Sequence, residues 1–209
     1  MNLPNKISLG RIIAMPLFLL FFLLDFTGAK FIALGIFVVA IFSDFLDGYI
    51  ARKYNLVTNL GKFLDTIADK ILATTGVILL IVGDSAIIPH PYGAIFMFIM
   101  ILRDYAVTAL RQTAQLKNII IPADMLGKIK ANFIYATLIY GLLIASLNDF
   151  SVVASSAFMK YFTIIFYVLV GVTTFFIILS GVMYLVRHFD VFKEEKKEVK
   201  EEKEESTEA

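Results

Sequence analysis

Six long apolar stretches constrain this chain more than any other feature, because each can cross a lipid bilayer as a helix. A membrane-spanning helix needs about 20 consecutive, mostly apolar residues. The stretches cover residues 11–28, 31–50, 63–83, 93–112, 129–148 and 161–186. The chain is also 59% hydrophobic, with a mean hydropathy of +0.81, whereas soluble domains are about 45–50% apolar. The sequence therefore predicts an all-α, polytopic membrane protein with six transmembrane helices.

The charges divide the chain into three expected segments. Residues 1–10 are predicted to form a short interfacial segment, and residues 11–186 the six-helix transmembrane domain. Residues 187–209 form a charged tail in which nine acids face six bases. Such a run is typical of a solvated, flexible extension, and we expect it to be a flexible cytoplasmic tail.

Lysine and arginine also predict the orientation, because cytoplasmic loops carry an excess of them. One set of loops and ends holds most of these residues outside the apolar stretches, and the opposite set holds only Lys30 and Lys160. Both termini and the loops near 52–62 and 112–128 are therefore predicted to be cytoplasmic. The loop at 84–92 is predicted to lie outside.

Four aspartates lie within two adjacent predicted spans, where ionisable residues are costly and usually functional. Asp44 and Asp47 are three residues apart, and Asp65 and Asp69 are four apart. Each spacing places both acids on one helical face. The short connection at 53–62 makes the two helices antiparallel neighbours, so both pairs are expected to converge at one depth, near the cytoplasmic boundary.

Four carboxylates cannot remain ionised together in a low-dielectric site without positive charge. The chain has no cysteine and only two histidines, which excludes thiolate or histidine-rich metal sites. Hard divalent cations suit carboxylate oxygens, and a pair of such ions is the usual arrangement for displacement at phosphorus. The alternative is that the acids form salt bridges with Arg52, Lys62 and Lys70.

The residues between the acids are those expected around a phosphate. Gly48 leaves the Asp44 face open, and Arg52 follows at the helix end, where its guanidinium can bind phosphate with two hydrogen bonds. Gly61 lies in the first turn of the next helix, behind a cap at Thr58 or Asn59, and helix N-termini favour anions. Simple helix packing is the alternative explanation for both glycines.

Together these residues spell D-x2-D-G-x2-A-R-x8-G-x3-D-x3-D from Asp44 to Asp69. This pattern resembles the signature of the CDP-alcohol phosphatidyltransferases. The resemblance implies transfer of a phosphatidyl group from CDP-diacylglycerol to an alcohol, with two divalent ions (Mg²⁺ or Mn²⁺), a homodimer and no nucleic-acid partner. It assigns metal binding to Asp44, Asp47, Asp65 and Asp69. Asp69 would also serve as, or lie beside, the general base, and Gly48, Arg52 and Gly61 would bind CDP.

Further stretches resemble phosphatidylglycerophosphate synthases, the members of the family that use glycerol 3-phosphate as acceptor. These are L-P-N-K-I-S-L-G-R at 3–11, R-D-Y-A-V-T-A-L-R at 103–111, G-K-I-K at 127–130 and S-G-V-M-Y-L at 180–185. Four cations in these stretches could bind an acceptor phosphate: Arg103, Arg111, Lys128 and Lys130. The alternatives are positive-inside anchoring for the lysines and an ion pair between Asp104 and Arg111.

We therefore expect an integral protein of the bacterial cytoplasmic membrane, with its active site facing the cytoplasm, that makes phosphatidylglycerophosphate and CMP. A member of the same family that uses inositol phosphate, serine or another alcohol is the alternative. Two remote alternatives are a membrane prenyltransferase, which should carry a second, distant aspartate-rich motif, and a divalent-cation transporter, whose acids should line a path near mid-membrane.

Overall fold

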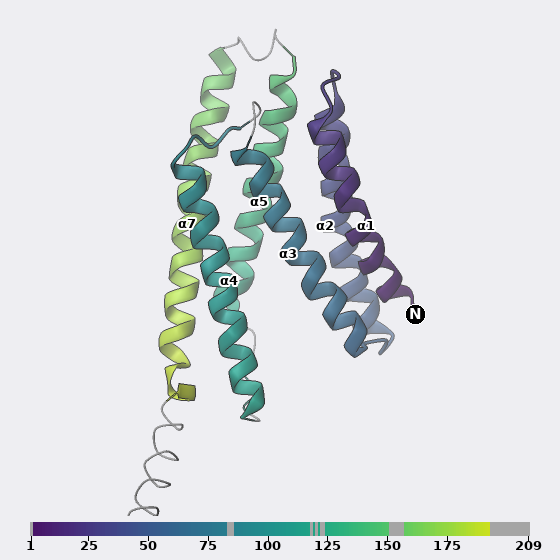
Figure 1. The fold of residues 1–209 in the computed structure, drawn as a ribbon, viewed down its shortest axis with the longest axis vertical. Helices are drawn as coiled ribbons and strands as arrows, with labels where there is room; N and C mark the ends of the chain where they lie inside the picture. The colour runs from purple at the N-terminus through teal and green to yellow at the C-terminus, as the bar shows by residue number, and fades with distance from the viewer. Residues whose placement is uncertain are drawn as a thin grey trace, which may run out of the picture.

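The computed structural model describes residues 2–82, 86–117, 119, 121, 124–150 and 157–192. This part of the chain is all helical, as predicted. Its long helices are α1 (Leu3–Leu23), α2 (Ala29–Lys53), α3 (Asn59–Ile81), α4 (Tyr92–Leu116), α5 (Met125–Asn148) and α7 (Ala157–Arg187), and a short 3-10 helix covers Phe189–Phe192. The starts of α1, α3 and α5 and the ends of α2, α4 and α7 lie toward one end of the bundle, which we call the lower end (Figure 1). Residues 193–209 of the predicted tail lie outside the described residues.

Five of these helices are long and apolar enough to cross a membrane, namely α1, α2, α4, α5 and most of α7. The prediction of a polytopic membrane protein is thus confirmed, and the sixth span stays a prediction. The sixth candidate, α3, is 23 residues long, but its first half carries Lys62, Asp65, Asp69 and Lys70. Its second half is apolar, and Leu72, Leu79 and Leu80 are buried.

The first helix begins earlier than its apolar stretch suggests. The Asn2 side chain caps it by accepting a hydrogen bond from the Asn5 amide (3.2 Å), and Pro4 occupies the first turn, where a missing N–H costs nothing. Residues 3–10 are therefore continuous with residues 11–23 in one helix. The placement of the first ten residues at the membrane interface stays a prediction.

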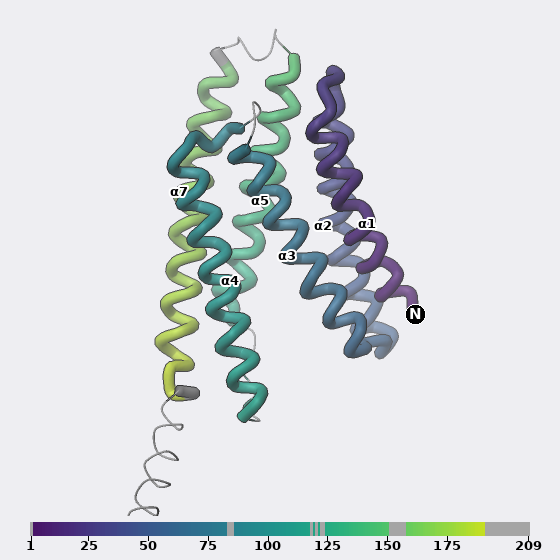
Figure 2. The backbone as a smooth tube through the Cα atoms, viewed as in Figure 1, coloured from purple at the N-terminus to yellow at the C-terminus, as the bar shows by residue number. Residues whose placement is uncertain are grey.

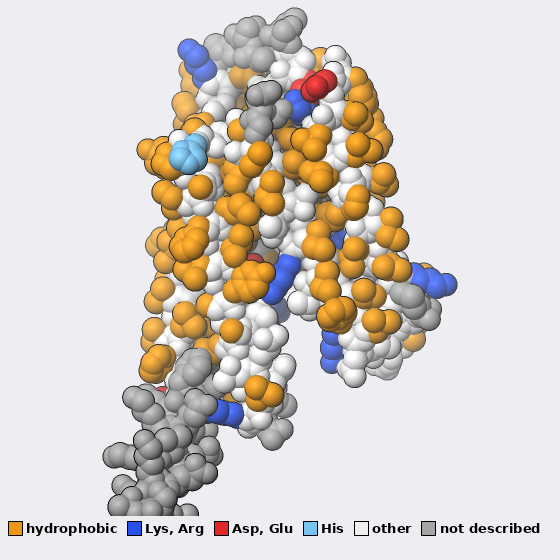
Figure 3. Space-filling view, viewed as in Figure 1, with side chains coloured by type: hydrophobic (Ala, Val, Ile, Leu, Met, Phe, Trp, Pro, Cys, Tyr) orange, Lys and Arg blue, Asp and Glu red, His pale blue; other side chains and the backbone are white. Residues whose placement is uncertain are grey.

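The helices form two groups that separate toward the lower end. Helix α1 packs on α2 and α3, while α7 packs on α4 and α5, and α5 joins the groups through contacts with α2 and α3. Figure 2 shows α1, α2 and α3 leaning away from α4 and α7 below the middle of the molecule. Figure 3 shows the resulting hollow, with Lys and Arg side chains at its edge and apolar side chains over much of the remaining surface.

The core lies above this hollow. Phe18, Phe37, Leu72, Leu138 and Phe166 are fully or almost fully buried there. Two glycines permit the close approach of the helices, which in membranes depends on small residues. A Cβ atom on Gly141 would lie 2.6 Å from a Leu80 methyl carbon, and one on Gly76 would lie 3.1 Å from Leu138. This packing fixes α3 against α5 and so sets the geometry of the hollow below.

Candidate catalytic site

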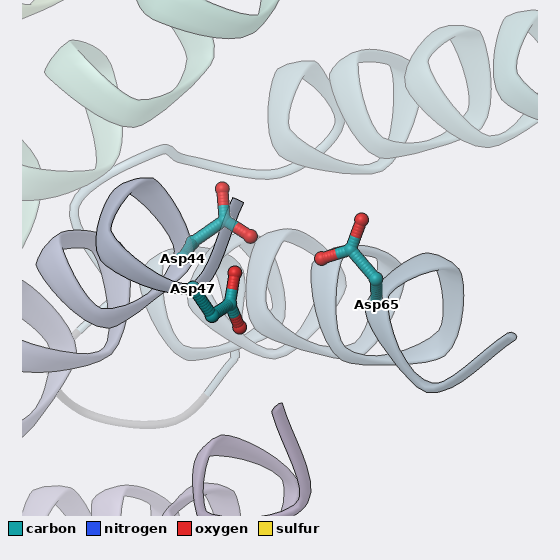
Figure 4. Close-up of side chains that lie close together, drawn as sticks. All are labelled: Asp44, Asp47 and Asp65. Carbon is teal, nitrogen blue, oxygen red and sulfur yellow. The ribbon is translucent and has the colours of Figure 1, made fainter. Parts of the chain in front are cut away.

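Helices α2 and α3 bring three aspartates of the signature together. Carboxylate oxygens of Asp44, Asp47 and Asp65 all lie within 4.8 Å of one another, and Figure 4 shows the carboxylates of α2 facing that of α3. The arrangement follows from the short connection between the helices and from the Thr58 hydroxyl, which caps α3 by accepting from the Gly61 amide (3.0 Å). The predicted convergence of the two pairs is thus confirmed for these three acids.

A buried arginine from α1 holds the cluster together, and it also brings in Asp69. Arg11 Nη1 donates to Asp44 Oδ1 (2.5 Å) and Asp69 Oδ1 (3.2 Å), and its Nη2 donates to Asp47 Oδ2 (2.6 Å). The same Nη1 lies 3.8 Å from Asp65 Oδ1. The Arg11 side chain has no exposed surface, so its interaction with the almost equally buried Asp47 is screened least, while water screens its interactions with the more exposed acids.

Two further α1 residues support the signature helices. The Ser8 hydroxyl donates to Asp47 Oδ2 (2.8 Å), and the side-chain amide of Asn5 donates through Nδ2 to the Thr58 hydroxyl oxygen (3.1 Å). Asn5, Ser8 and Arg11 are not among the site residues that the sequence predicts. The signal was present, because polar residues recur every three positions along one side of an apolar helix.

The alternative prediction, that salt bridges with nearby basic residues neutralise the aspartates, named the wrong basic residues. None of Arg52, Lys62 and Lys70 pairs with the aspartates among the described residues; Lys70 donates instead to the Thr108 hydroxyl (3.2 Å). Arg11 is the cation that the cluster contacts there, and one guanidinium against four carboxylates leaves a negative excess. Clustered, partly open carboxylate oxygens of this kind suit hard divalent cations.

The predicted CDP-binding residues line one cavity of about 250 Å³ between α1, α2 and α3, beside Asp47 and Asp65. The Arg52 guanidinium lies over Gly48, and a Cβ atom at Gly48 would lie 3.5 Å from Arg52 Nη2, which is an ordinary van der Waals contact. Gly61 is required more strictly, since its Cβ would lie 2.6 Å from Asn5 Oδ1. Packing therefore accounts for Gly61 even before any ligand is considered, and its amide is already bonded to Thr58.

The four predicted acceptor-binding cations line a second cavity, of about 390 Å³, between α3, α4 and α5. Asp65 and Asp69 form part of its α3 wall, and Asp65 is the signature aspartate common to both cavities. The side chains of Asp65 and Asp69 are about half exposed (50% and 45%), whereas that of Asp47 is 5% exposed. The α3 acids are therefore the ones open to a ligand in the second cavity.

The cations of this second cavity differ in their partners. Arg103 Nη1 (3.2 Å) and Lys130 Nζ (2.6 Å) both donate to Asp104 Oδ1. Arg111 does not pair with Asp104, contrary to the ion pair considered from their spacing. Its Nε donates instead to the Tyr184 hydroxyl of α7 (2.8 Å). Lys128 lies at the cavity wall, with its side chain exposed.

Comparison with known proteins shows which family the chain is similar to. Residues 1–187 match the CDP-alcohol phosphatidyltransferase family. A CDP-diacylglycerol--glycerol-3-phosphate 3-phosphatidyltransferase of Bacillus subtilis is 40% identical over 141 residues, which are 62% of this chain and 70% of the relative. Enzymes of the same description from Wigglesworthia glossinidia brevipalpis (33% identical, 78% of this chain and 94% of the relative) and Escherichia coli (34%, 62% and 70%) also match. With the family matched over nearly the whole helical region and the aspartate cluster assembled, the chain belongs to the CDP-alcohol phosphatidyltransferase family.

Proposed function

We propose that this protein transfers a phosphatidyl group from CDP-diacylglycerol to sn-glycerol 3-phosphate, giving phosphatidylglycerophosphate and CMP. The observation that carries the proposal is that Asp65 lines two cavities, one beside Arg52 and Gly48 and the other beside four cations. Two substrates that each carry phosphate can therefore bind on either side of Asp65, each with cationic side chains in its own cavity. The relatives named above carry this activity in their descriptions, which supports the same choice of acceptor.

The donor belongs in the cavity between α1, α2 and α3. The Arg52 guanidinium can bind the pyrophosphate with two parallel hydrogen bonds. Gly48, which has no side chain, lines the same cavity beside it. The acceptor belongs in the cavity between α3, α4 and α5, where its phosphate meets Arg111 and Lys128. Arg103 and Lys130 line the same cavity, and both donate hydrogen bonds to Asp104. The two substrates then approach each other across Asp65.

Asp69 is the residue that we assign to proton transfer. It lines the acceptor cavity and is about half exposed, while its Oδ1 accepts from Arg11. The acceptor hydroxyl oxygen forms a bond to the β-phosphorus of the donor as its proton passes to the Asp69 carboxylate. The bond from that phosphorus to the bridging oxygen breaks, and CMP leaves with the electron pair.

The cofactor that we propose is a pair of divalent ions, Mg²⁺ or Mn²⁺, held by Asp44, Asp47, Asp65 and Asp69. Bound there, the ions would neutralise the pyrophosphate and the charge on departing CMP. The donor set fits, because three carboxylates offer oxygens within 4.8 Å of one another and the negative excess left by Arg11 requires further positive charge.

The orientation that we propose places the lower end of the bundle in the cytoplasm. The lower end holds the aspartate cluster and the basic residues Arg52, Lys53, Arg111 and Lys128. The upper end holds the ion pair between Lys30 and Asp149. This distribution supports a cytoplasmic active site under the positive-inside rule, where water-soluble glycerol 3-phosphate is available.

The direct test uses purified protein in detergent micelles with CDP-diacylglycerol, Mg²⁺ and radiolabelled glycerol 3-phosphate. We expect labelled phosphatidylglycerophosphate and equimolar CMP, both abolished by EDTA. Inositol phosphate and serine serve as competing acceptors, and Asp65→Asn is the inactive control. Faster CMP release with another acceptor would overturn the assignment of glycerol 3-phosphate, and activity retained in EDTA would overturn the metal requirement.

A further inference from the structure

Helix α7 carries two hydroxyl side chains that hold the two arginines of α4. Ser180 and Tyr184 lie one turn apart on the same face of α7. Ser180 Oγ accepts from Arg103 Nη2 (2.7 Å), and the Tyr184 hydroxyl accepts from Arg111 Nε (2.8 Å). Gly181 lies between them in the sequence and allows the Arg103 side chain to pass close to the α7 backbone. A Cβ atom at this position would lie 2.9 Å from Arg103 Cγ.

The two arginines are held in electrostatically different ways. Arg103 also donates to Asp104, which Lys130 shares, so a carboxylate offsets part of their charge. Arg111 pairs with no carboxylate in the part of the chain that the structure describes, and Tyr184 is neutral. The Arg111 guanidinium carbon also lies 5.4 Å from the centre of the Tyr184 ring, a cation–π contact. Arg111 is therefore fixed in position while it keeps its full charge.

We propose that Tyr184 is a positioning residue for acceptor binding, which orients Arg111 toward the acceptor phosphate. The proposal rests on the function proposed above. Tyr184 is only 1% exposed and lies behind Arg111, which lines the acceptor cavity. The tyrosine uses the Nε–H and leaves the terminal nitrogens of Arg111 for the phosphate, which guanidinium groups bind through two parallel hydrogen bonds.

The test is the steady-state kinetics of Tyr184→Phe, which removes the hydroxyl and keeps the ring. We expect the KM for glycerol 3-phosphate to rise about three- to tenfold, the size associated with one lost hydrogen bond. The KM for CDP-diacylglycerol and kcat should change less than twofold, because the hydroxyl touches neither the donor cavity nor the aspartates. A purely structural role would instead lower kcat or affect both KM values.

A double-mutant cycle makes the test specific to the pair. In an Arg111→Ala background, Tyr184→Phe should have no further effect on the KM for glycerol 3-phosphate, because its partner is gone. Tyr167→Phe is the matched control on the same helix, since its hydroxyl donates to the Ile87 carbonyl (3.1 Å) at the upper end of the bundle. That variant should leave both KM values unchanged. Melting temperatures in detergent identify any variant that is merely unstable.

The outcomes separate this inference from the function on which it rests. If Arg111→Ala weakens glycerol 3-phosphate binding but Tyr184→Phe does not, the positioning role of Tyr184 is refuted and the acceptor site stands. If the two substitutions act independently in the cycle, the positioning role is refuted as well. If the wild-type protein prefers another acceptor, the proposed function itself fails.

Discussion

Replacing Arg11 by methionine tests the idea that this guanidinium is the internal counter-charge of the aspartate cluster. The substitution keeps a long apolar stem but removes hydrogen bonds of 2.5, 2.6 and 3.2 Å to three carboxylates. Removing one partner of a buried ion pair costs about 3–5 kcal/mol, because the remaining charge is left uncompensated. On the scaling of globular domains of this size, that is a fall in melting temperature of roughly 6–20 °C.

Divalent ions should restore most of this loss. In EDTA, Arg11→Met leaves four carboxylates facing one another, whereas in Mg²⁺ the ions supply the missing positive charge. A ligand that binds only the folded state stabilises it, so the stabilisation by Mg²⁺ should be larger in Arg11→Met than in the wild type. Thermal unfolding in detergent with EDTA or with saturating Mg²⁺ measures both values.

A surface arginine provides the control for that experiment. Arg187 lies 3.6 Å from Asp124 and its side chain is 58% exposed, so Arg187→Met should cost at most about 1 kcal/mol and should respond to Mg²⁺ as the wild type does. If Arg11→Met is destabilised equally in EDTA and in Mg²⁺, the counter-charge role of Arg11 is refuted, and Arg11 stabilises the fold through its hydrogen bonds alone.

Three further predictions concern the site and the topology. Asp65→Asn should abolish turnover while the protein stays folded, since Asp65 lines both cavities; substantial activity at saturating Mg²⁺ would contradict the two-metal site. Arg111→Ala should raise the KM for glycerol 3-phosphate about ten- to hundredfold, because it removes a charge-assisted hydrogen bond of about 1.5–3 kcal/mol, and should leave the KM for CDP-diacylglycerol unchanged. An equal loss of affinity for both substrates would mark Arg111 as structural. A cysteine at Ala86 should react with an impermeant reagent from outside the cell, and one at Gln115 only after the membrane is opened; the reverse pattern would invert the topology.

The helices and the aspartate cluster could be predicted because local signals specify both. Apolar stretches of about 20 residues identify spans, and spacings of three and four residues fix which acids share a face. The first helix shows the limit of this reasoning. Its apolar stretch begins at Arg11, but the Asn2 cap and Pro4 start the helix at Leu3, because hydrogen bonding rather than hydropathy sets helix ends.

The partners of the charged groups could not be predicted, because they depend on which helices pack together. The acids were expected to need metal ions or the cations nearest in sequence. The cation that contacts them is not one of those nearest in sequence but Arg11, 33 positions before Asp44, because α1 packs against both α2 and α3. Asp104 likewise pairs with Lys130 of α5 rather than with Arg111. Spacing along one helix therefore identified the charged residues but not the partner from another helix.

The position of Asp65 in the wall of both cavities has a kinetic consequence. With CDP-diacylglycerol in one cavity and the acceptor in the other, both substrates occupy the enzyme at the same time. We therefore expect the phosphatidyl group to pass directly from donor to acceptor in a ternary complex, with inversion at phosphorus and without a covalent enzyme intermediate. Double-reciprocal plots at several fixed acceptor concentrations should therefore intersect, whereas parallel lines would indicate that CMP leaves before the acceptor binds.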